Sequence, residues 1–380
     1  MKIGFDGKRA VNNNTGLGNY SRLVVDVLSA YYPANEYVLY VPEIKDNPRM
    51  KPLTERNNVR LCEPDSSIGR VLGSAWRSFG VTSQIKRDGI DLFHGLSNEL
   101  PLNISSSGIT SVVTIHDVIF RRVPENYKAA DRLIYDFKFR RACKDATRII
   151  AVSERTKSDI VNDYGIDPAK VDVIYQGCHP QFGYPQDFET KQEVREKYNL
   201  PERYYISVGT VETRKNQLLA LKALRALPSD VKMVIVGRRT DYAKQLDQFI
   251  SSNRLSDRVI FLENVPFVEL PALYSMACFA TYTSRYEGFG IPIVEALSAG
   301  VPVVACTGSC LEEAGGTGAI YINPDDTDAM TDAALKLLED GYLRDKMVES
   351  GRRHIKSFTN AEFARRTIAS YNKAIVSSIF

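Results

Sequence analysis

Short apolar runs rich in β-branched and aromatic residues alternate with helical patterns along all 380 residues of the chain. Because strands joined through helices run parallel, this pattern predicts an α/β fold in which helices cover parallel sheets. The runs form two series, so we expect two doubly wound domains. The expected strands are 2–5, 37–41, 59–62, 92–94, 111–115, 148–152 and 172–175 in the first series and 204–208, 232–236, 259–262, 279–283, 302–305 and 319–322 in the second.

A stretch without periodicity separates the two series. Residues 177–189 are rich in Gly, Pro and aromatic side chains, which is typical of a connection between domains. The sequence therefore predicts a first domain over 1–178, a second over 179–359 and a last helix over 360–377. Ligands of doubly wound sheets bind beyond the carboxyl ends of the strands, so functional residues are expected at those ends.

The strand expected to end near Tyr282 leads into a Gly-rich turn and then a helix. Pro292 occupies the expected first position of that helix, and Gly300 closes it. Glu287 falls in the turn and Glu295 in the first helical turn, so the two carboxylates can reach different parts of one extended polar ligand. The free amides of a helix start also favour an anion. The alternative is an ordinary acidic helix start preceded by turn glycines.

The segment EGFGIPIVEALSAGVPVVA, with its E-x(7)-E pattern, resembles the donor-site signature of family 4 retaining glycosyltransferases. The segment VGTVETRKN (208–216) resembles the diphosphate-binding segment of the same family, in its bacterial mannosyltransferase-type variant. The resemblance extends over nearly the whole chain. It implies a GT-B fold, in which two Rossmann-like domains face each other across a cleft. The second domain would bind the nucleotide-sugar donor, and a last helix over about 360–380 would cross back to the acceptor-side first domain.

The resemblance also assigns roles to the turn and the helix start. It implies that Glu287 binds hydroxyls of the donor sugar and takes part in catalysis, and that Glu295 binds the donor ribose. The other residues implied to bind the donor here are Gly288, Phe289, Gly290 and Ile291.

Two cations, Arg214 and Lys215, follow the first strand of the second series and precede a helix. A diphosphate suits such a pair, because hydrogen bonds between charged groups are roughly twice as strong as neutral ones. Glu212 is placed to hold the cations in position. Many family members have Arg where this chain has Thr210, which puts one phosphate contact in doubt and leaves Arg214 to replace it. The alternative is a solvated basic pair.

A polar loop with Gly16 and Gly18 follows the first strand, without the third glycine of the dinucleotide fingerprint. The two glycines let backbone approach a phosphate closely, and the resemblance implies that the loop meets the donor phosphates and the acceptor; a plain tight turn is the alternative. His116 closes a strand and is a candidate to bond a sugar hydroxyl or the reacting centre, or else is structural. Asp117 can orient its ring or cap the next helix, and His94 is a weaker candidate.

Composition excludes several classes of function. A net charge of +3 argues against nucleic-acid binding, and six singly scattered cysteines indicate reduced thiols in a cytosolic protein. No spacing predicts a metal site, since the acidic run 325–328 fits a helix N-cap. We therefore expect no metal and no cofactor, with cations and helix dipoles neutralising the phosphates. The sequence shows neither a signal peptide nor a membrane-spanning run, so any membrane contact is expected to be peripheral.

One segment departs from this near-neutral background. Residues 120–141 hold seven Arg or Lys among five aromatic residues. Such a segment can hold a protein on an anionic membrane beside a lipid-linked acceptor. Alternatively, it is an amphipathic helix whose aromatic rings enter the core and whose cations are solvated.

The function implied by the resemblance is transfer of a hexose to a hydroxyl of a glycan or polyprenyl-linked acceptor in polysaccharide biosynthesis. The donor expected first is GDP-mannose, which would supply mannose. The first alternative keeps the fold and uses UDP-glucose or UDP-N-acetylglucosamine. A second, a non-catalytic nucleotide-sugar-binding protein, would bind the donor without turnover. An NAD-dependent oxidoreductase would need a complete G-x-G-x-x-G with an acidic ribose partner, which this chain lacks.

Overall fold

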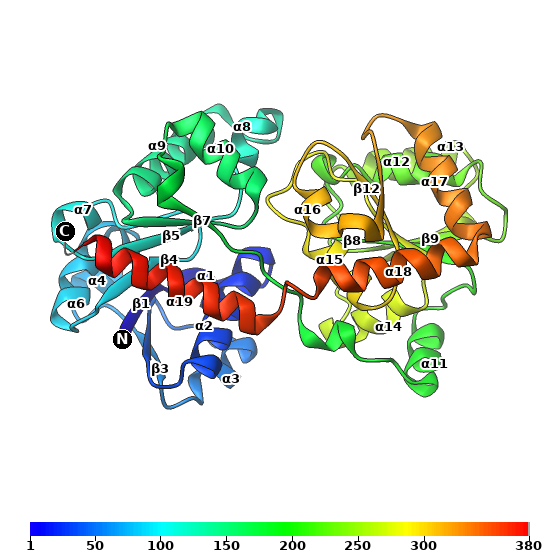
Figure 1. The fold of residues 1–380 in the computed structure, drawn as a ribbon. Coiled ribbons are helices and arrows are strands. Elements are labelled where there is room, and N and C mark those ends of the chain that lie inside the picture. The colour runs from blue at the N-terminus through cyan, green and yellow to red at the C-terminus, as the bar shows by residue number, and fades with distance from the viewer. Residues whose placement is uncertain (379–380) are drawn as a thin grey trace. The chain divides into compact units, whose positions relative to one another are not determined.

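The computed structural model describes residues 1–378. The chain divides into two compact units, each built on one sheet (Figure 1). The first unit comprises Met1–Arg121, Tyr127–Tyr175 and the chain from Asn360 onward, and the second comprises Arg122–Asn126 and Gln176–Thr359. The chain therefore leaves the first unit, builds most of the second and returns.

The sheet of the first unit has seven parallel strands in the order β3-β2-β1-β4-β5-β6-β7. This is a doubly wound order, which reverses between β1 and β4 and so creates a crevice at the carboxyl ends of these two strands. The strands are β1 Lys2–Asp6, β2 Glu36–Tyr40, β3 Val59–Cys62, β4 Leu92–Gly95, β5 Ser111–Ile115, β6 Arg148–Ala151 and β7 Val171–Val173.

Helices cover both faces of this sheet, with α9 and α10 on one side and α2 on the other (Figure 1). They are α1 Lys8–Asn12, α2 Gly16–Tyr31, α3 Lys51–Thr54, α4 Ser67–Val71, α5 Gly73–Ala75, α6 Val81–Arg87, α7 Ile104–Ser107, α8 Ile119–Arg122, α9 Ala129–Asp145, α10 Glu154–Tyr164 and α19 Asn360–Ser377. The short turns between them are η1 Pro48–Met50, the π-helical η2 Trp76–Gly80 and η4 Pro168–Lys170, while η3 Pro124–Asn126 belongs to the second unit.

Polar contacts fix α19 on the first unit. The Tyr371 hydroxyl lies 2.6 Å from Nδ1 of His94 on β4, and the Ser370 hydroxyl donates to Asp172 on β7 over 2.8 Å. Tyr371 is fully buried, so this helix completes the core of the unit.

The sheet of the second unit has six parallel strands in the order β10-β9-β8-β11-β12-β13, with helices on both faces (Figure 1). The strands are β8 Tyr204–Val208, β9 Lys232–Val236, β10 Val259–Leu262, β11 Phe279–Tyr282, β12 Val303–Cys306 and β13 Ala319–Ile322. The helices are α11 Phe188–Lys197, α12 Gln217–Leu224, α13 Ala243–Ser252, α14 Leu270–Ser275, α15 Ile291–Ser298, α16 Leu311–Gly315, α17 Thr327–Glu339 and α18 Gly341–Ile355. The 3-10 turns are η5 Pro180–Gly183, η6 Thr213–Lys215, η7 Ser256–Arg258, η8 Phe267–Glu269 and η9 Gly316–Gly318.

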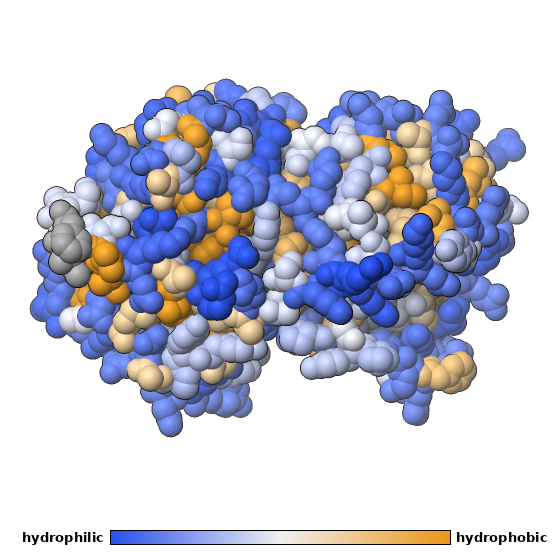
Figure 2. Space-filling model, in the orientation of Figure 1, coloured by the Kyte–Doolittle hydropathy of each residue, from blue (hydrophilic) through white to orange (hydrophobic). Residues whose placement is uncertain are grey.

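The predicted α/β class and two doubly wound sheets are confirmed, and every expected strand is present with its ends within two residues. The agreement has a physical cause, because parallel strands covered on both faces are apolar at nearly every position. In β9, Met233, Val234, Ile235 and Val236 are all buried. On the surface shown in Figure 2, hydrophilic residues predominate and hydrophobic side chains appear between them.

Candidate functional site

Two neighbouring strands of the second unit bring three of the predicted site residues together, Arg214, Lys215 and Glu287. β8 and β11 are paired in parallel, so the segments that follow them emerge at the same edge of the sheet. Hydrogen bonds join these two segments. The Thr283 hydroxyl donates to the carbonyl oxygens of Lys215 and Asn216, each over 3.0 Å, and the Arg285 amide donates to the Arg214 carbonyl over 2.9 Å.

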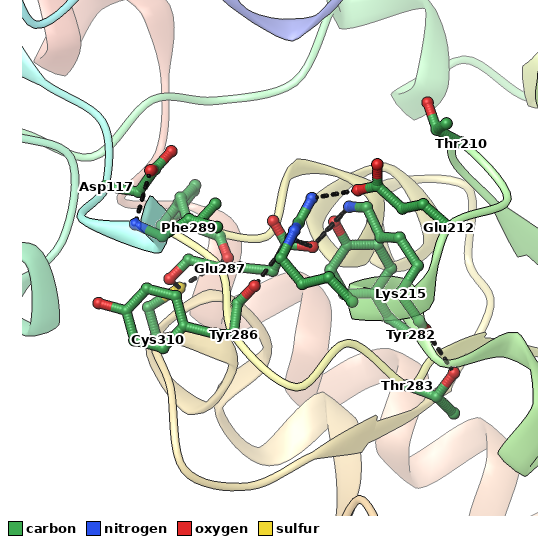
Figure 3. Close-up of polar contacts among 12 residues, drawn as sticks. Asp117, Thr210, Glu212, Lys215, Tyr282, Thr283, Tyr286, Glu287, Phe289 and Cys310 are labelled. Atoms are coloured by element: carbon green, nitrogen blue, oxygen red, sulfur yellow. Dashed lines mark hydrogen bonds and ion pairs between the residues drawn. The ribbon is translucent and has the colours of Figure 1, made fainter. Parts of the chain in front are cut away.

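Glu287 lies at the centre of this site (Figure 3). Its Oε1 is 2.5 Å from Nζ of Lys215 and 2.6 Å from Nη1 of Arg214, and it accepts a hydrogen bond from the Tyr282 hydroxyl over 3.1 Å. The Tyr282 hydroxyl also contacts the Lys215 ammonium, which lies 4.5 Å from the centre of the tyrosine ring. Glu212 accepts from Arg214 over 2.6 Å, which is the holding contact that the sequence predicts.

The charges of this cluster are set by burial and by mutual attraction. Burial alone raises the pKa of Glu287, but the charges of Lys215 and Arg214 outweigh it and bring that pKa down to about 2. Burial likewise lowers the pKa of Lys215, against the attraction of Glu287. For Arg214, burial is outweighed by the charges of Glu287 and Glu212, which raise its pKa. The carboxylate is therefore a permanent acceptor beside two cations.

Glycine permits the loop after β8 to adopt its path. Gly209 and Gly237 have φ of +142° and +153°, and a Cβ on Gly237 would lie 2.0 Å from the Gly209 carbonyl oxygen. Thr210 is half-buried, and its carbonyl accepts from the Gln217 side chain over 3.0 Å. The loop then ends at Asn216, which has φ of 52° and is the N-cap of α12. This geometry keeps Arg214 and Lys215 next to the end of β11.

The turn after β11 is held by a cysteine that the sequence did not mark as part of a site. The Cys310 thiol lies 3.2 Å from the Glu287 carbonyl oxygen and 2.7 Å from that of Phe289, and is shared between them (Figure 3). Gly290 is the N-cap of α15, where a Cβ would lie 3.1 Å from the Ala314 side chain. Gly288 and Phe289 are buried, while Ile291 is half-buried as the first residue of α15.

The predicted position of Glu295 in the first helical turn is wrong. The helix α15 begins at Ile291, so Pro292 is its second residue and Glu295 its fifth, in the second turn. The carboxylate accepts a hydrogen bond from the Tyr274 hydroxyl on α14 over 3.3 Å, and burial raises its pKa to about 7. Gly300 does close the helix: its φ is +78°, and the Val301 amide donates to the Ala296 carbonyl over 2.9 Å.

The prediction that Gly16 and Gly18 lie in a loop is wrong, because both belong to the first turn of α2, which begins at Gly16 in the first unit after a short loop. The two glycines differ in the space around them. A Cβ on Gly16 would meet nothing within 4 Å, whereas one on Gly18 would lie 1.7 Å from the Asn13 carbonyl oxygen. The Arg22 guanidinium fixes the loop by donating to the carbonyls of Ala10 and Asn13 over 2.6 and 2.8 Å. Gly18 is thus required by the fold, while Gly16 is not.

His116 is buried at the end of β5 in the first unit. Its Nε2 donates to the Leu96 carbonyl over 2.9 Å, and its ring packs edge-on against Tyr20 with centroids 4.5 Å apart. Burial lowers its pKa to about 4, so the imidazole is neutral with its lone pair on Nδ1. Asp117 caps the next helix, since its Oδ1 accepts from the Ile119 amide over 3.0 Å.

His94 is part of the core rather than of a site. Both of its ring nitrogens have partners, the Tyr371 hydroxyl at 2.6 Å and the Thr114 hydroxyl at 2.8 Å. Burial lowers its pKa to about 3, so it remains neutral. This histidine joins β4, β5 and α19.

The acidic run 325–328 forms the predicted helix start. Asp326 caps α17 by accepting from the Ala329 amide over 2.8 Å, and Asp325 pairs with Arg285. Over residues 1–378, no group of three or more His, Cys, Asp or Glu side chains is arranged to hold a metal ion. In the same part of the chain, no helix has both the length and the apolar character that a membrane span requires.

Both halves of this chain are similar in sequence to known proteins. Residues 189–354 match the family model "Glycosyl transferases group 1", and residues 24–182 match "Glycosyltransferase Family 4". The O-antigen chain mannosyltransferase B of Escherichia coli is 30% identical over 98% of this chain and 99% of its own length. The O-antigen chain mannosyltransferase RfbU of Salmonella typhimurium is 32% identical over 56% of this chain and 57% of its own length.

Solved structures share the fold at lower identity. HepE of Anabaena in complex with UDP-glucose superposes with a TM-score of 0.78 at 19% identity, over 98% of this chain and 99% of that one. WaaG, a glycosyltransferase involved in lipopolysaccharide biosynthesis, gives 0.71 at 18% identity, over 97% and 98%. With the two family matches and the full-length relative, these likenesses show that the chain belongs to glycosyltransferase family 4 and has the GT-B fold.

Proposed function

We propose that this glycosyltransferase moves mannose from GDP-mannose, with retention of anomeric configuration, to a hydroxyl of a glycan or a lipid-linked acceptor. The observation that carries the proposal is the ionised Glu287 held between Arg214 and Lys215. The choice of mannose is supported by the relatives named O-antigen chain mannosyltransferases. The location proposed with it is cytoplasmic, with peripheral attachment to the membrane.

The site chemistry suits a diphosphate leaving group. Arg214 and Lys215 can bond its oxygens, and Glu287, an acceptor only, can then receive hydrogen bonds from sugar hydroxyls. In the proposed step the bond from the sugar C1 to the phosphate oxygen breaks as the acceptor oxygen bonds C1 on the same face. The acceptor proton passes to the leaving phosphate. In this proposal Glu287 binds the donor sugar and is not the nucleophile, with two cations engaging its Oε1.

We also propose that the reaction needs no divalent metal. Negative charge grows on the leaving diphosphate, and fixed cations beside it lower the barrier without reorganisation. Arg214 and Lys215 supply two such charges on a loop that is hydrogen-bonded to β11. Gly16 is assigned to the donor phosphates and His116 to a sugar hydroxyl, as the family resemblance implies. Thr210 is proposed to contact the donor although it replaces an Arg that many family members have.

A thermal-shift screen with GDP-mannose, UDP-glucose and UDP-N-acetylglucosamine, each with and without EDTA, tests the donor. A ligand at a hundred times its dissociation constant adds about 2.7 kcal/mol of stability. We expect GDP-mannose to give the largest shift, and NMR of the product to show the donor's anomeric configuration. A larger shift with a UDP-sugar would move the proposal to that donor. Binding without turnover on any glycan acceptor would favour a binding protein, and an inverted product or loss of activity in EDTA would contradict the mechanism.

A further inference from the structure

The first half of α9 lies on the surface of the first unit, with its side chains exposed or half-buried. Over 129–138, none of the side chains is buried. Leu133 is 74% exposed, Ile134 52% and Phe137 56%. A patch of exposed apolar side chains on a protein surface indicates a site of interaction with another protein or with a membrane.

The opposite side of the same helix explains why α9 nevertheless has a fixed position. Phe139, Ala142 and Cys143 are buried, and the Phe139 ring stacks on that of Tyr164 in α10 with centroids 4.9 Å apart. Phe120 is buried as well, 5.8 Å from the Phe139 ring. The aromatic residues of 120–141 are therefore divided, some forming core and others, Phe137 among them, facing water.

The exposed residues form one face. Leu133, Phe137, Arg140 and Lys144 are spaced i, i+4, i+7 and i+11, which places them along a single stripe of the helix, and all four are exposed. Ile134 lies beside this stripe. The stripe is apolar toward the start of α9 and basic toward its end. We call these five residues the α9 face.

Charge is concentrated around the α9 face. Residues 120–141 contain seven Arg or Lys and three Asp or Glu, a net charge of +4, while the whole chain has +3. The rest of the chain is therefore slightly negative. Several of these cations have carboxylate partners yet still reach solvent; the Arg140 side chain, 3.6 Å from Asp136, is 56% exposed.

We propose that the α9 face docks on an anionic membrane surface, with Leu133, Ile134 and Phe137 inserted at the headgroup boundary and Arg140 and Lys144 on lipid phosphates. An apolar patch with basic neighbours matches the two forces that hold peripheral proteins on such membranes. The inference deepens the proposed function and in part rests on it, because a lipid-linked acceptor is delivered at such a surface. The helix would lie parallel to the membrane plane.

Sedimentation of the full chain with vesicles tests the docking. Vesicles of phosphatidylcholine alone are compared with an equal mixture of phosphatidylcholine and phosphatidylglycerol, at low salt and at about 0.15 M salt. We expect binding to the mixed vesicles only, weaker at the higher salt. The double variant Leu133→Ser/Phe137→Ser should bind about tenfold or more weakly at both salts. Arg140→Gln/Lys144→Gln should lose a similar factor at low salt and less at high salt.

The matched control is Phe188→Ser/Val268→Ser in the second unit, where the two side chains are 83% and 70% exposed. It removes similar apolar surface but should bind as the wild type does. Depth is tested with Phe137→Trp, because the single native tryptophan, Trp76, is buried and contributes a constant background. Its emission should shift to the blue on mixed vesicles and be quenched by brominated lipid.

Three results would overturn the docking. They are no binding of the wild type to mixed vesicles at either salt, equal losses of vesicle affinity in Leu133→Ser/Phe137→Ser and in the control, or Phe137→Trp emission that brominated lipid does not quench. Donor shifts measured on the same samples separate this inference from the proposed function. If the protein binds GDP-mannose but does not bind vesicles, the docking alone is refuted. A protein that binds vesicles through the α9 face but no nucleotide sugar refutes the donor assignment alone.

Discussion

The Lys215 ammonium and the Glu287 carboxylate form a buried ion pair, with Nζ and Oε1 2.5 Å apart, that joins the loop after β8 to the turn after β11. Arg214 and the Tyr282 hydroxyl share the same carboxylate oxygen. A single oxygen atom therefore receives contacts from three side chains. Loss of the Glu287 charge should therefore lower both the stability of the fold and the rate of turnover.

Glu287→Gln should lower both stability and turnover. The amide keeps the shape of the carboxylate, but it leaves Lys215 and Arg214 without their shared anion in a buried place. Breaking a buried pair in this way costs about 3 to 5 kcal/mol. Urea denaturation gives the stability, and initial rates at a saturating concentration of the proposed donor, GDP-mannose, give the turnover.

Glu212→Gln is the matched control for that change. Its carboxylate also contacts Arg214, but its side chain is 36% exposed, against 11% for Glu287. The expected loss of stability is about 1 kcal/mol or less. Equal losses in the two variants would contradict the central position of Glu287.

Glu295→Gln should stabilise the protein at neutral and alkaline pH. The folded-state pKa of Glu295 is raised from 4.5 to about 7, so between these values the folded protein holds a proton that the unfolded chain has released. Stability therefore falls as pH rises through this window, and the full deficit is present above it. The glutamine variant lacks this deficit, a gain on the order of 3 kcal/mol near pH 8.

Thermal unfolding of both proteins at about pH 4 and pH 8 checks the sign. We expect the gain to disappear at the lower pH, where both side chains are neutral. If Glu295 binds the donor ribose, the same variant should also bind GDP-mannose more weakly, so that stability and affinity change in opposite directions. A variant that is less stable at pH 8 would show that the carboxylate is structural.

Gly16→Ala and Gly18→Ala should separate binding from folding. The methyl group at Gly16 enters open space, whereas the one at Gly18 collides with the Asn13 carbonyl oxygen. We expect Gly16→Ala to keep the wild-type melting temperature and to raise the KM for the donor, because the added methyl group would hold a phosphate away from the backbone at the start of α2. Gly18→Ala should lose stability by roughly 1 to 3 kcal/mol. A donor KM unchanged in Gly16→Ala would exclude the start of α2 from the donor site.

His116→Gln and His94→Gln should differ in what they change. His116 uses one ring nitrogen for the Leu96 carbonyl, and an amide can replace that bond, so stability should stay within about 1 kcal/mol while turnover falls. His94 joins Tyr371 and Thr114, and its replacement should mainly destabilise the fold. Because the pKa of His116 is about 4, turnover should show no histidine titration between about pH 5.5 and 8. A titration that disappears in His116→Gln would contradict this.

Sequence patterns predicted the sheets well, because strands buried on both faces leave an apolar run that neighbouring turn residues delimit. They predicted the position of Glu295 less well. Proline is tolerated at the first or second helical position, and a shift of one residue moved the carboxylate into the second turn.

Other site residues were invisible for a different reason. Tyr282 is the last residue of an apolar strand, and Cys310 is one of six scattered cysteines. Their roles arise only when β11 lies beside the loop after β8 and α16 lies under the turn. The same limit applies to α9, since Phe137 and Phe139 are alike in sequence, but Phe139 stacks on the Tyr164 ring whereas Phe137 is 56% exposed.

Because α19 returns to the first unit, most of the second unit is inserted into the sequence of the first. The two units are therefore not simply consecutive along the chain. A protein truncated after Tyr175 would keep all seven strands but lose Tyr371, the partner of His94, and would expose the apolar surface that this helix covers. Dissection of the enzyme by simple truncation should therefore fail for the first unit. A fragment in which residues 176–359 are replaced by a short linker, so that α19 is retained, is the form expected to fold alone.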